Sequence, residues 1–298
     1  MVVRYKKLFA YYNLKTITIA VIKISFKLFG TLPLSFLRSF GKAFGFLRWV
    51  LSKKYRKHFK NSWLQAKKAD EQGRMDECSF FKAVGNSGEI FIETTKIWTQ
   101  SNIISLVETK GIDLIQEAIK HGKGLICLTP HLGSFELAPR VVSEFMPLTV
   151  MYRPPKRGDL NELLVYFRDF QNVTMVKTNY AGVKSLIKFL KGGNCVGILP
   201  DQVPDRGAGK WTPFFAKLAY TNTLVIRLAK LTSAPIAWIS CVKSSKGWKF
   251  SAEIWSYKFD KSTDENESLI ELNRKIEQLI YEHPEEYLWG YDRFKMPK

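Results

Sequence analysis

Short apolar runs alternate with longer amphipathic segments from Gly111 to the carboxyl end of the chain, and this alternation restricts the fold more than any other feature. The runs 124–128, 148–152 and 195–199 are bounded by glycine, proline or polar residues, as buried strands are. Strands that alternate with helices favour a sheet of mostly parallel strands with helices on both faces. We therefore predict an α/β fold built around such a sheet.

The predicted elements follow from apolar spacing and from breaks at glycine and proline. The predicted strands are 124–128, 148–152, 173–176, 195–199, 236–241 and 248–255, and the predicted helices are 112–121, 135–145 with an interruption at Pro139, 161–170, 181–190, 224–231 and 267–282. Residues 61–106 are predicted as short helices interrupted at Gly73 and at 85–88. Residues 204–210 are predicted as a flexible loop that could lie over a substrate.

The charge of the chain is concentrated at its amino-terminal end. Residues 1–69 contain sixteen Lys and Arg and no Asp or Glu, whereas the rest of the chain carries 30 basic and 27 acidic residues, for a net charge of +19 overall. Basic residues interleaved with Phe, Leu, Ile and Trp suit an anionic membrane surface. Nucleic acid is a less suitable partner, because the apolar side chains would then face water. We predict membrane-associating amphipathic helices over 1–60 and the α/β domain over 61–298.

The segment 16–37 is long enough to cross a bilayer, but Lys23 and Lys27 interrupt it. A central lysine costs about 2.5–3.5 kcal/mol on insertion scales. Both lysines share one helix face, which we expect to look at lipid headgroups. An interfacial helix is favoured, and a single uncleaved span is the alternative. A cleaved signal peptide is disfavoured. After a break at Pro33, a second amphipathic helix is predicted over 34–60.

The cysteines predict neither disulfides nor structural zinc. All four are far apart and none has CxxC spacing, which is typical of a reduced, cytoplasm-facing protein: Cys78, Cys127, Cys195 and Cys241. The histidines have no metal-ligand spacing with one another, so we predict no metal. No P-loop, GxGxxG or GxSxG motif is present, and we predict no cofactor.

The candidate catalytic residues are His131 and Glu136. His131 follows the predicted strand 124–128 and therefore falls at the carboxyl end of that strand, where α/β sheets bind ligands. A neutral imidazole can take the proton of an alcohol at neutral pH when its other ring nitrogen is held by a partner. Glu136, about one helical turn further on, is the predicted partner that orients the ring.

Further site residues are predicted after other strands. Arg153 should project from the sheet edge into the same cleft, with a surface salt bridge as the alternative. Asp201 and Gln202 should lie beside His131 if their strands are neighbours, and could bind polar groups of a substrate or place donors for an oxyanion; only Gln202 or a backbone N–H can serve as such a donor. Phe214 and Phe215 are predicted either to contact an acyl chain or to pack in the core.

Four motifs occur together in one order. They are His-Leu-Gly-Ser-Phe-Glu at 131–136, Met-Tyr-Arg-Pro at 151–154, Leu-Pro-Asp-Gln at 199–202 with Thr-Pro-Phe-Phe at 212–215, and Pro-Glu-Glu-Tyr-Leu-Trp at 284–289. In this order and spacing the chain resembles the bacterial lipid A biosynthesis acyltransferases, within the lysophospholipid acyltransferase superfamily. The resemblance extends from about residue 32 to Lys295.

The resemblance implies an inner-membrane enzyme of the HX4E type, peripheral or single-span, with its catalytic domain facing the cytoplasm. It implies transfer of a fatty acyl chain from acyl carrier protein, or from acyl-CoA, to a hydroxyl of a lipid A precursor. Anionic membrane lipids are the further partners that the basic amino-terminal segment predicts. It also implies that Arg153 grips a phosphate or an acyl-donor group. The oligomeric state stays open.

Two departures from the family pattern leave the acceptor open. Ala216 stands where the family has glycine after the paired phenylalanines, and Asp292 stands in a tail that is otherwise basic, although Arg293, a predicted substrate-binding residue, and Lys295 are kept. The alternatives are acyl transfer to a lysophospholipid, an aminolipid or another glycolipid. A further alternative is a basic membrane-binding protein without catalytic activity.

Overall fold

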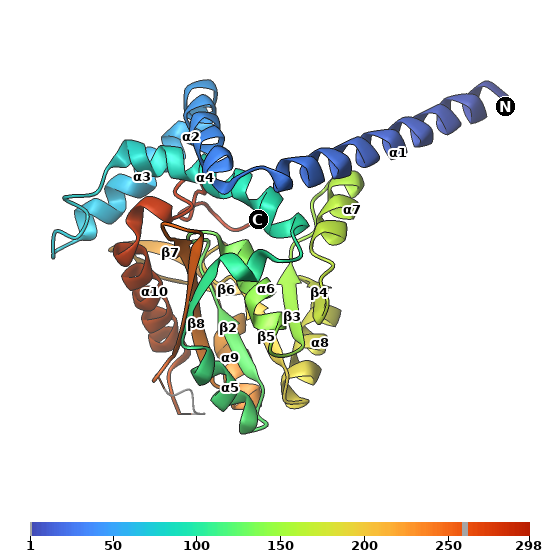
Figure 1. The fold of residues 1–298 in the computed structure, drawn as a ribbon. Helices are drawn as coiled ribbons and strands as arrows, with labels where there is room; N and C mark the ends of the chain where they lie inside the picture. The colour runs from blue at the N-terminus through green and yellow to red at the C-terminus, as the bar shows by residue number, and fades with distance from the viewer. Residues whose placement is uncertain (1, 258–261) are drawn as a thin grey trace.

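A seven-stranded, mostly parallel sheet forms the centre of the molecule (Figure 1). The computed structural model describes residues 2–257 and 262–298, and the side chains from Ile17 onward within that range. The strand order is β1-β9-β8-β2-β5-β3-β4, and only the pair β8–β9 is antiparallel. The strands are β1 (Val107–Lys110), β2 (Leu125–Leu128), β3 (Leu148–Tyr152), β4 (Val173–Lys177), β5 (Cys195–Ile198), β8 (Ile236–Lys243) and β9 (Trp248–Ile254), with β6 (Gly209–Phe214) and β7 (Lys217–Asn222) forming a separate hairpin.

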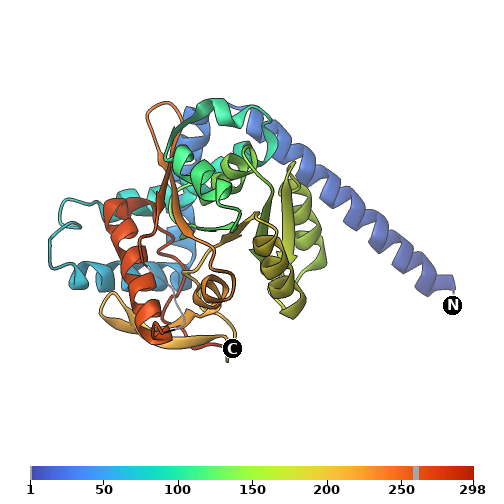
Figure 2. The same cartoon turned by 90° about the horizontal axis from the view of Figure 1, so that it is seen from below.

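Helices surround the sheet (Figures 1 and 2). They are α1 (Val2–Thr31), α2 (Leu34–Leu51), α3 (Lys53–Ala69), α4 (Phe80–Thr99), α5 (Ile112–Lys120), α6 (Ala138–Ser143), α7 (Gly158–Phe167), α8 (Tyr180–Lys191), α9 (Leu224–Thr232) and α10 (Glu265–Glu282), with short 3-10 turns η1 (Ile103–Leu106), η2 (Phe135–Leu137) and η3 (Pro284–Glu286). Successive side chains of a strand point to opposite faces. Ile126 and Leu128 accordingly pack with α8, α9 and α10, whereas Leu125 and Cys127 pack with α5 and α6. The predicted α/β architecture with a mostly parallel sheet is confirmed.

Two predictions about individual elements are wrong. The helix predicted over 34–60 is two helices, because the backbone turns at Ser52, whose hydroxyl accepts a hydrogen bond from Tyr55 N and begins α3. The break predicted at 85–88 is absent, because these residues lie inside α4. Their glycines serve close packing instead: a Cβ added to Gly88 would lie 2.2 Å from the carbonyl oxygen of Gly41 and 2.3 Å from the amide nitrogen of Gly45, both on α2. The backbones of α2 and α4 therefore touch.

The hairpin β6–β7 turns at two residues with positive φ, Phe215 at 48° and Ala216 at 55°. Glycine is favoured in such a turn because a Cβ costs energy in the left-handed region. The turn is held from two sides: Gln65 Nε2 donates to the Phe215 carbonyl at 2.7 Å, and Phe215 N donates to Glu277 Oε1 at 2.7 Å. These contacts from α3 and α10 keep the turn in place although position 216, where the resemblance leads us to expect glycine, carries alanine.

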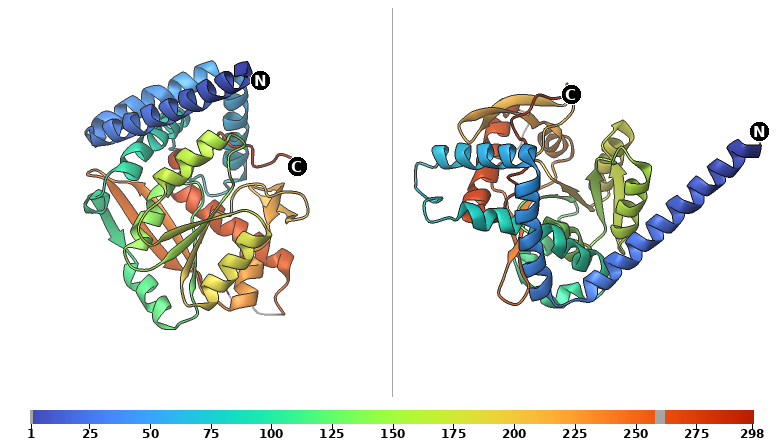
Figure 3. Two further views of the ribbon diagram at one scale, coloured as in Figure 1. Left: turned by 90° about the vertical axis from the view of Figure 1, so that its right-hand side faces the viewer. Right: turned by 90° about the horizontal axis from the view of Figure 1, so that it is seen from above.

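The amino-terminal helices lie at one end of the molecule, where α1 extends beyond the α/β body (Figures 1 and 3). Pro33 separates α1 from α2, as predicted. Lys23 and Lys27 share a face, as predicted, and that face lies over Tyr166 of α7, with Lys23 Nζ 3.8 Å and Lys27 Nζ 5.9 Å from the centre of the ring. Their contact with lipid headgroups stays a prediction. Among the described residues, none of the helices has a stretch both long and apolar enough to cross a bilayer.

We expect Gly88→Ala to lower the free energy of unfolding by about 1–3 kcal/mol, because the added methyl group forces α2 and α4 apart. Gly85→Ala is the matched control on the same helix: the atoms nearest to its methyl group would belong to the side chains of Phe46 and Lys42, at 3.3 Å or more. Gly85→Ala should be neutral or stabilising by about 0.5–1 kcal/mol. Urea unfolding of both variants in detergent checks this, and equal losses in the two would contradict the close packing at Gly88.

Candidate active site

His131 lies at the carboxyl end of β2, as predicted. One of the two parallel neighbours of β2 is β5, with Leu128 opposite Ile198, and Thr129 N donates to the Ile198 carbonyl at 3.3 Å. Because the chains of β2 and β5 leave the sheet at the same edge, the segment 201–202 after β5 lies beside His131. The predicted proximity of Asp201 and Gln202 to His131 is confirmed.

Asp201 is the carboxylate that holds the imidazole. Its Oδ1 lies 2.8 Å from His131 Nδ1, and its Oδ2 accepts the backbone N–H of His131 at 3.0 Å. The side chain is 2% exposed and lies behind His131, outside the cavity described below. Burial alone would raise the pKa of the Asp201 carboxyl, but the electrostatic interaction with His131 and the hydrogen bonds from the ring and backbone N–H of that residue outweigh burial and lower that pKa below its usual value.

Gln202 contacts the other ring nitrogen. Its Nε2 lies 3.0 Å from His131 Nε2, and an amide nitrogen can only donate. His131 Nε2 is therefore the acceptor, and Nδ1 carries the proton that is donated to Asp201. This tautomer directs a basic lone pair toward the cavity side of the ring.

Glu136 does not contact the His131 ring, so the predicted orienting contact is corrected to Asp201. Glu136 instead forms an ion pair with Arg168, whose Nε donates to Oε2 at 3.0 Å, and accepts a hydrogen bond from Trp98 Nε1 at 3.1 Å. The physical reason lies in the loop between them. Gly133 N donates to the Glu286 carbonyl and Ser134 N to the Cys241 carbonyl, so the helical turn η2 begins only at Phe135 and directs Glu136 toward α4 and α7.

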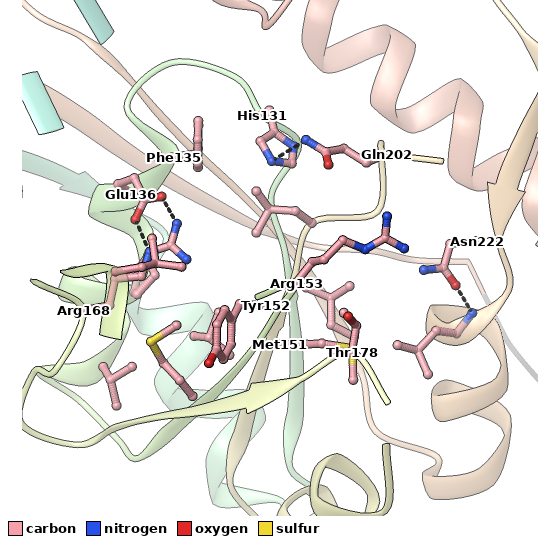
Figure 4. A pocket seen from close by; sticks show the side chains of 18 of the residues that line it. His131, Phe135, Glu136, Met151, Tyr152, Arg153, Arg168, Thr178, Gln202 and Asn222 are labelled. Atoms are coloured by element: carbon pink, nitrogen blue, oxygen red, sulfur yellow. Dashed lines mark hydrogen bonds and ion pairs between the residues drawn. The ribbon is translucent and has the colours of Figure 1, made fainter. Parts of the chain in front are cut away.

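A cavity of about 310 Å³ is lined by His131, Gln202 and Glu136 (Figure 4). Its polar wall carries His131, Glu136, Arg153, Arg168 and Gln202. The remainder is mostly apolar and includes Val150, Met151, Tyr152, Leu164, Phe170, Val173, Met175, Ile198, Leu199 and Leu224. Such a size and an apolar lining with a few convergent polar groups are typical of small-ligand sites.

Arg153 reaches the cavity from the end of β3, as predicted. It also forms a surface salt bridge, which was the alternative prediction for this residue. Its guanidinium lies 2.7 Å from Asp205 Oδ1 on the loop after β5. Both side chains are more than half exposed, so this pair contributes little to stability and can be exchanged for another anion.

Three predicted substrate contacts lie elsewhere. Phe214 and Phe215 are buried in the core, where Phe215 packs on Tyr281 and Trp289. Of the two predictions for these residues, core packing is therefore the one that the structure confirms. Arg293 is also buried and donates to the Tyr220 carbonyl and the Thr221 hydroxyl of β7, both at 2.8 Å. None of the three lines the cavity.

The sequence reasoning missed Arg168 and Trp98, since each lies in an ordinary helical segment with no local motif. The described residues contain no group of three or more His, Cys, Asp and Glu side chains that could hold a metal ion. The four cysteines are free thiols in the structure.

The comparisons with known proteins agree on one family. Residues 6–296 match the family model described as bacterial lipid A biosynthesis acyltransferase. The chain is 28% identical over 204 residues to the lipid A biosynthesis palmitoleoyltransferase of Escherichia coli K12, covering 66% of this chain and 64% of that protein. It is 26% identical over 206 residues to a lipid A biosynthesis acyltransferase of Haemophilus influenzae, covering 68% and 62%, and 24% identical over 200 residues to the E. coli K12 lauroyltransferase, covering 66% and 65%. Each match spans less than two thirds of the relative's length.

We expect Asp201→Asn to lower the free energy of unfolding by about 2 kcal/mol at pH 7, because hydrogen bonds from His131 to a carboxylate are replaced by bonds to a neutral amide. Since folding lowers the pKa of Asp201, its contribution is present above the unfolded value of about 4 and is lost as the pH falls through the lower folded value. The difference from wild type should shrink on acidification. Urea unfolding at several pH values measures it, with the exposed Asp76→Asn as control; a difference that does not depend on pH contradicts the assignment.

Proposed function

Because the chain belongs to the bacterial lipid A biosynthesis acyltransferase family, we propose that it transfers a fatty acyl chain from an acyl thioester to a hydroxyl of a lipid A precursor or a related lipid. The observation that carries the proposal is the hydrogen-bonded His131: Asp201 holds one ring nitrogen, and the other directs its lone pair to a cavity with an apolar lining. A base at the head of an apolar cavity suits a reaction in which an alcohol attacks a fatty acyl group.

In the proposed reaction the acceptor hydroxyl displaces Gln202 from His131 Nε2. The hydroxyl oxygen then forms a bond to the thioester carbonyl carbon while Nε2 takes the hydroxyl proton. The tetrahedral intermediate collapses with cleavage of the carbon–sulfur bond, and the leaving thiolate receives the proton from the imidazolium. Asp201 stabilises the imidazolium between these two transfers.

Gln202 and Arg168 are the proposed partners of the developing negative charge. Once displaced, the Gln202 amide has N–H groups available for the oxyanion. Glu136 holds the Arg168 guanidinium at two points on the cavity wall, so its proposed role is to position this cation rather than the imidazole. Arg153, after exchange of Asp205, is placed to bind a phosphate of the donor or the acceptor.

The apolar residues that line the cavity, among them Val150 and Leu224, form the proposed site of the acyl chain. Phe214 and Phe215 are not part of this site. Acyl carrier protein is the proposed donor, because an acidic carrier is attracted to a chain with a net charge of +19. Acyl-CoA is the alternative donor. A lysophospholipid, an aminolipid or another glycolipid is the alternative acceptor.

We also propose that α1 and α2 bind the cytoplasmic surface of the inner membrane. On α1 a stripe of exposed apolar side chains follows helical spacing: Ile17, Val21, Ile24 and Leu28. On α2 a similar stripe consists of Phe36, Phe40, Leu47 and Leu51. Exposed lysines lie nearby on α2 and α3, including Lys42, Lys53 and Lys57, and these would attract anionic lipid.

We expect His131→Ala to lower acyl transfer by about 10²–10⁴-fold, because the hydroxyl loses its base. His121→Ala is the matched control, since that histidine is exposed on the surface after α5. The assay follows a labelled acyl chain from acyl carrier protein, and separately from CoA, to a lipid A precursor and to lysophospholipid. Equal activity of His131→Ala and wild type would refute the mechanism, and a wild-type protein without transfer to any of these acceptors would favour the non-catalytic alternative.

The acceptor is identified by mass spectrometry of lipids from cells with wild-type protein, with His131→Ala and without the gene. We expect a lipid A species that carries one additional acyl chain only in the wild-type cells. A new acyl group on another lipid class would assign the acceptor to that class.

We expect Leu28→Asp to weaken binding to vesicles of phosphatidylglycerol and phosphatidylethanolamine by about tenfold or more, because insertion of a leucine contributes about 1.5–3 kcal/mol. Leu231→Asp is the matched control: Leu28 and Leu231 are both 63% exposed, and Leu231 lies on α9, near the opposite end of the molecule (Figure 1). Vesicle sedimentation measures the partition. Equal losses in both variants would show that the α1 stripe is not the membrane contact.

A further inference from the structure

The carboxyl-terminal segment 284–289 packs directly against the backbone of residues 131–133, which follow β2. Leu132 and Tyr287 form an antiparallel bridge, and Leu288 N donates to the His131 carbonyl at 3.0 Å. Gly133 N in turn donates to the Glu286 carbonyl at 2.9 Å. None of the residues 284–289 lines the cavity.

Tyr287 extends this packing to the carboxylate that holds His131. Its hydroxyl donates to Asp201 Oδ2 at 3.2 Å, and the side chain is buried, with its ring edge-on to Trp289 at a centroid distance of 4.9 Å. The same Oδ2 accepts the backbone N–H of His131. Tyr287 therefore holds the oxygen that does not face the imidazole, and leaves Oδ1 directed at Nδ1.

We propose that Tyr287 is a positioning residue for acyl transfer, which acts through Asp201 to hold the ring and set the basicity of His131. The inference rests on the proposed function, since it assigns a role within the same hydrogen-bonded chain. The order of that chain is Tyr287, Asp201, His131 and then the acceptor hydroxyl.

The surrounding charges suit a neutral donor at this position. Burial and the negative charge of Asp201 keep the pKa of Tyr287 well above its usual value, so the phenol stays protonated and donates. The other ionisable groups near it are Arg293 and Tyr291. Arg293 directs its Nη1 and Nη2 to β7 rather than to Asp201, and the Tyr291 hydroxyl accepts from Val203 N. Tyr287 thus stabilises the carboxylate without neutralising it.

Removal of the Tyr287 hydroxyl should make Asp201 a stronger proton acceptor. The carboxylate then retains more negative charge at Oδ1, and the His131–Asp201 pair binds its proton more tightly. The acidic limb of the pH profile of kcat/KM should move to higher pH. The ring should also be held less firmly, which lowers kcat and leaves KM unchanged, because Tyr287 lies outside the cavity.

We expect Tyr287→Phe in the full-length protein to lower kcat about tenfold, the factor that corresponds to one hydrogen bond to a charged group. KM should stay within about twofold, and the acidic limb should move upward. Tyr281→Phe is the matched control: Tyr281 is also a buried tyrosine, but its hydroxyl donates to the Ala66 carbonyl on α3. A purely structural role for Tyr287 predicts that both variants lose stability and keep the wild-type pH profile, and this result would overturn the proposal.

Site-specific 3-fluorotyrosine at position 287 provides a second test that keeps the hydroxyl and nearly the same volume. The more acidic phenol is a stronger donor, so the acidic limb should move in the opposite direction, to lower pH. An unchanged limb in this protein overturns the proposal even if Tyr287→Phe does not fold. A wild-type protein that transfers no acyl chain would instead overturn the proposed function, and full activity of His131→Ala would refute the proposed mechanism. The failures are therefore distinguishable.

Discussion

The parallel pairing of β2 with β5 is the constraint on which the active site depends. It brings two segments that are 70 residues apart in the chain to one edge of the sheet, where His131 meets Asp201. Neither strand carries a catalytic side chain within its own length. The strands fix only where the two loops begin, and the contacts beyond the strand ends determine which way each side chain points.

A buried polar network connects that edge to the amino-terminal helices. Glu93 of α4 accepts hydrogen bonds from the Ser134 hydroxyl at 2.7 Å and from Trp248 Nε1 at 2.9 Å, and forms an ion pair with Arg38 of α2. A buried carboxylate is stable only when such partners satisfy it. Because the backbones of α2 and α4 touch at their glycines, the helices proposed to bind the membrane and the loop that carries His131 share one packed interface.

The fold could be predicted from the sequence where the signal is local. Apolar runs such as 148–152 have the length and the boundaries of buried strands, and β3 occupies the predicted residues. The glycines at 85–88 led to the wrong prediction of a helix break. An α-helix can contain glycine where the backbone of another helix approaches it, and here that helix, α2, lies about 40 residues earlier in the chain. The hairpin β6–β7 was missed because its turn uses Phe215 and Ala216 rather than glycine.

The site was predictable as a set of positions and less so as a set of contacts. His131, Gln202 and Arg153 lie where their strand ends imply, but the partner of the imidazole is Asp201, 70 residues away, rather than Glu136. Sequence spacing favoured Glu136 because a regular helix from Gly133 would return the side chain toward His131. Backbone hydrogen bonds to the carbonyls of Cys241 and Glu286 make the helical turn begin only at Phe135. No local sequence pattern indicates these long-range hydrogen bonds.

Gln202 donates to the lone pair of His131 Nε2. A water molecule that displaced this amide would exchange one hydrogen bond for another and gain little. An acceptor lipid, in contrast, brings the rest of its molecule, whose contacts with the cavity and the membrane offset the loss of the amide bond. In the proposed reaction a lipid hydroxyl that is held in the cavity can therefore displace Gln202 and reach the base, whereas a free water molecule cannot do so favourably. The thioester is then used for acyl transfer to lipid rather than lost to hydrolysis.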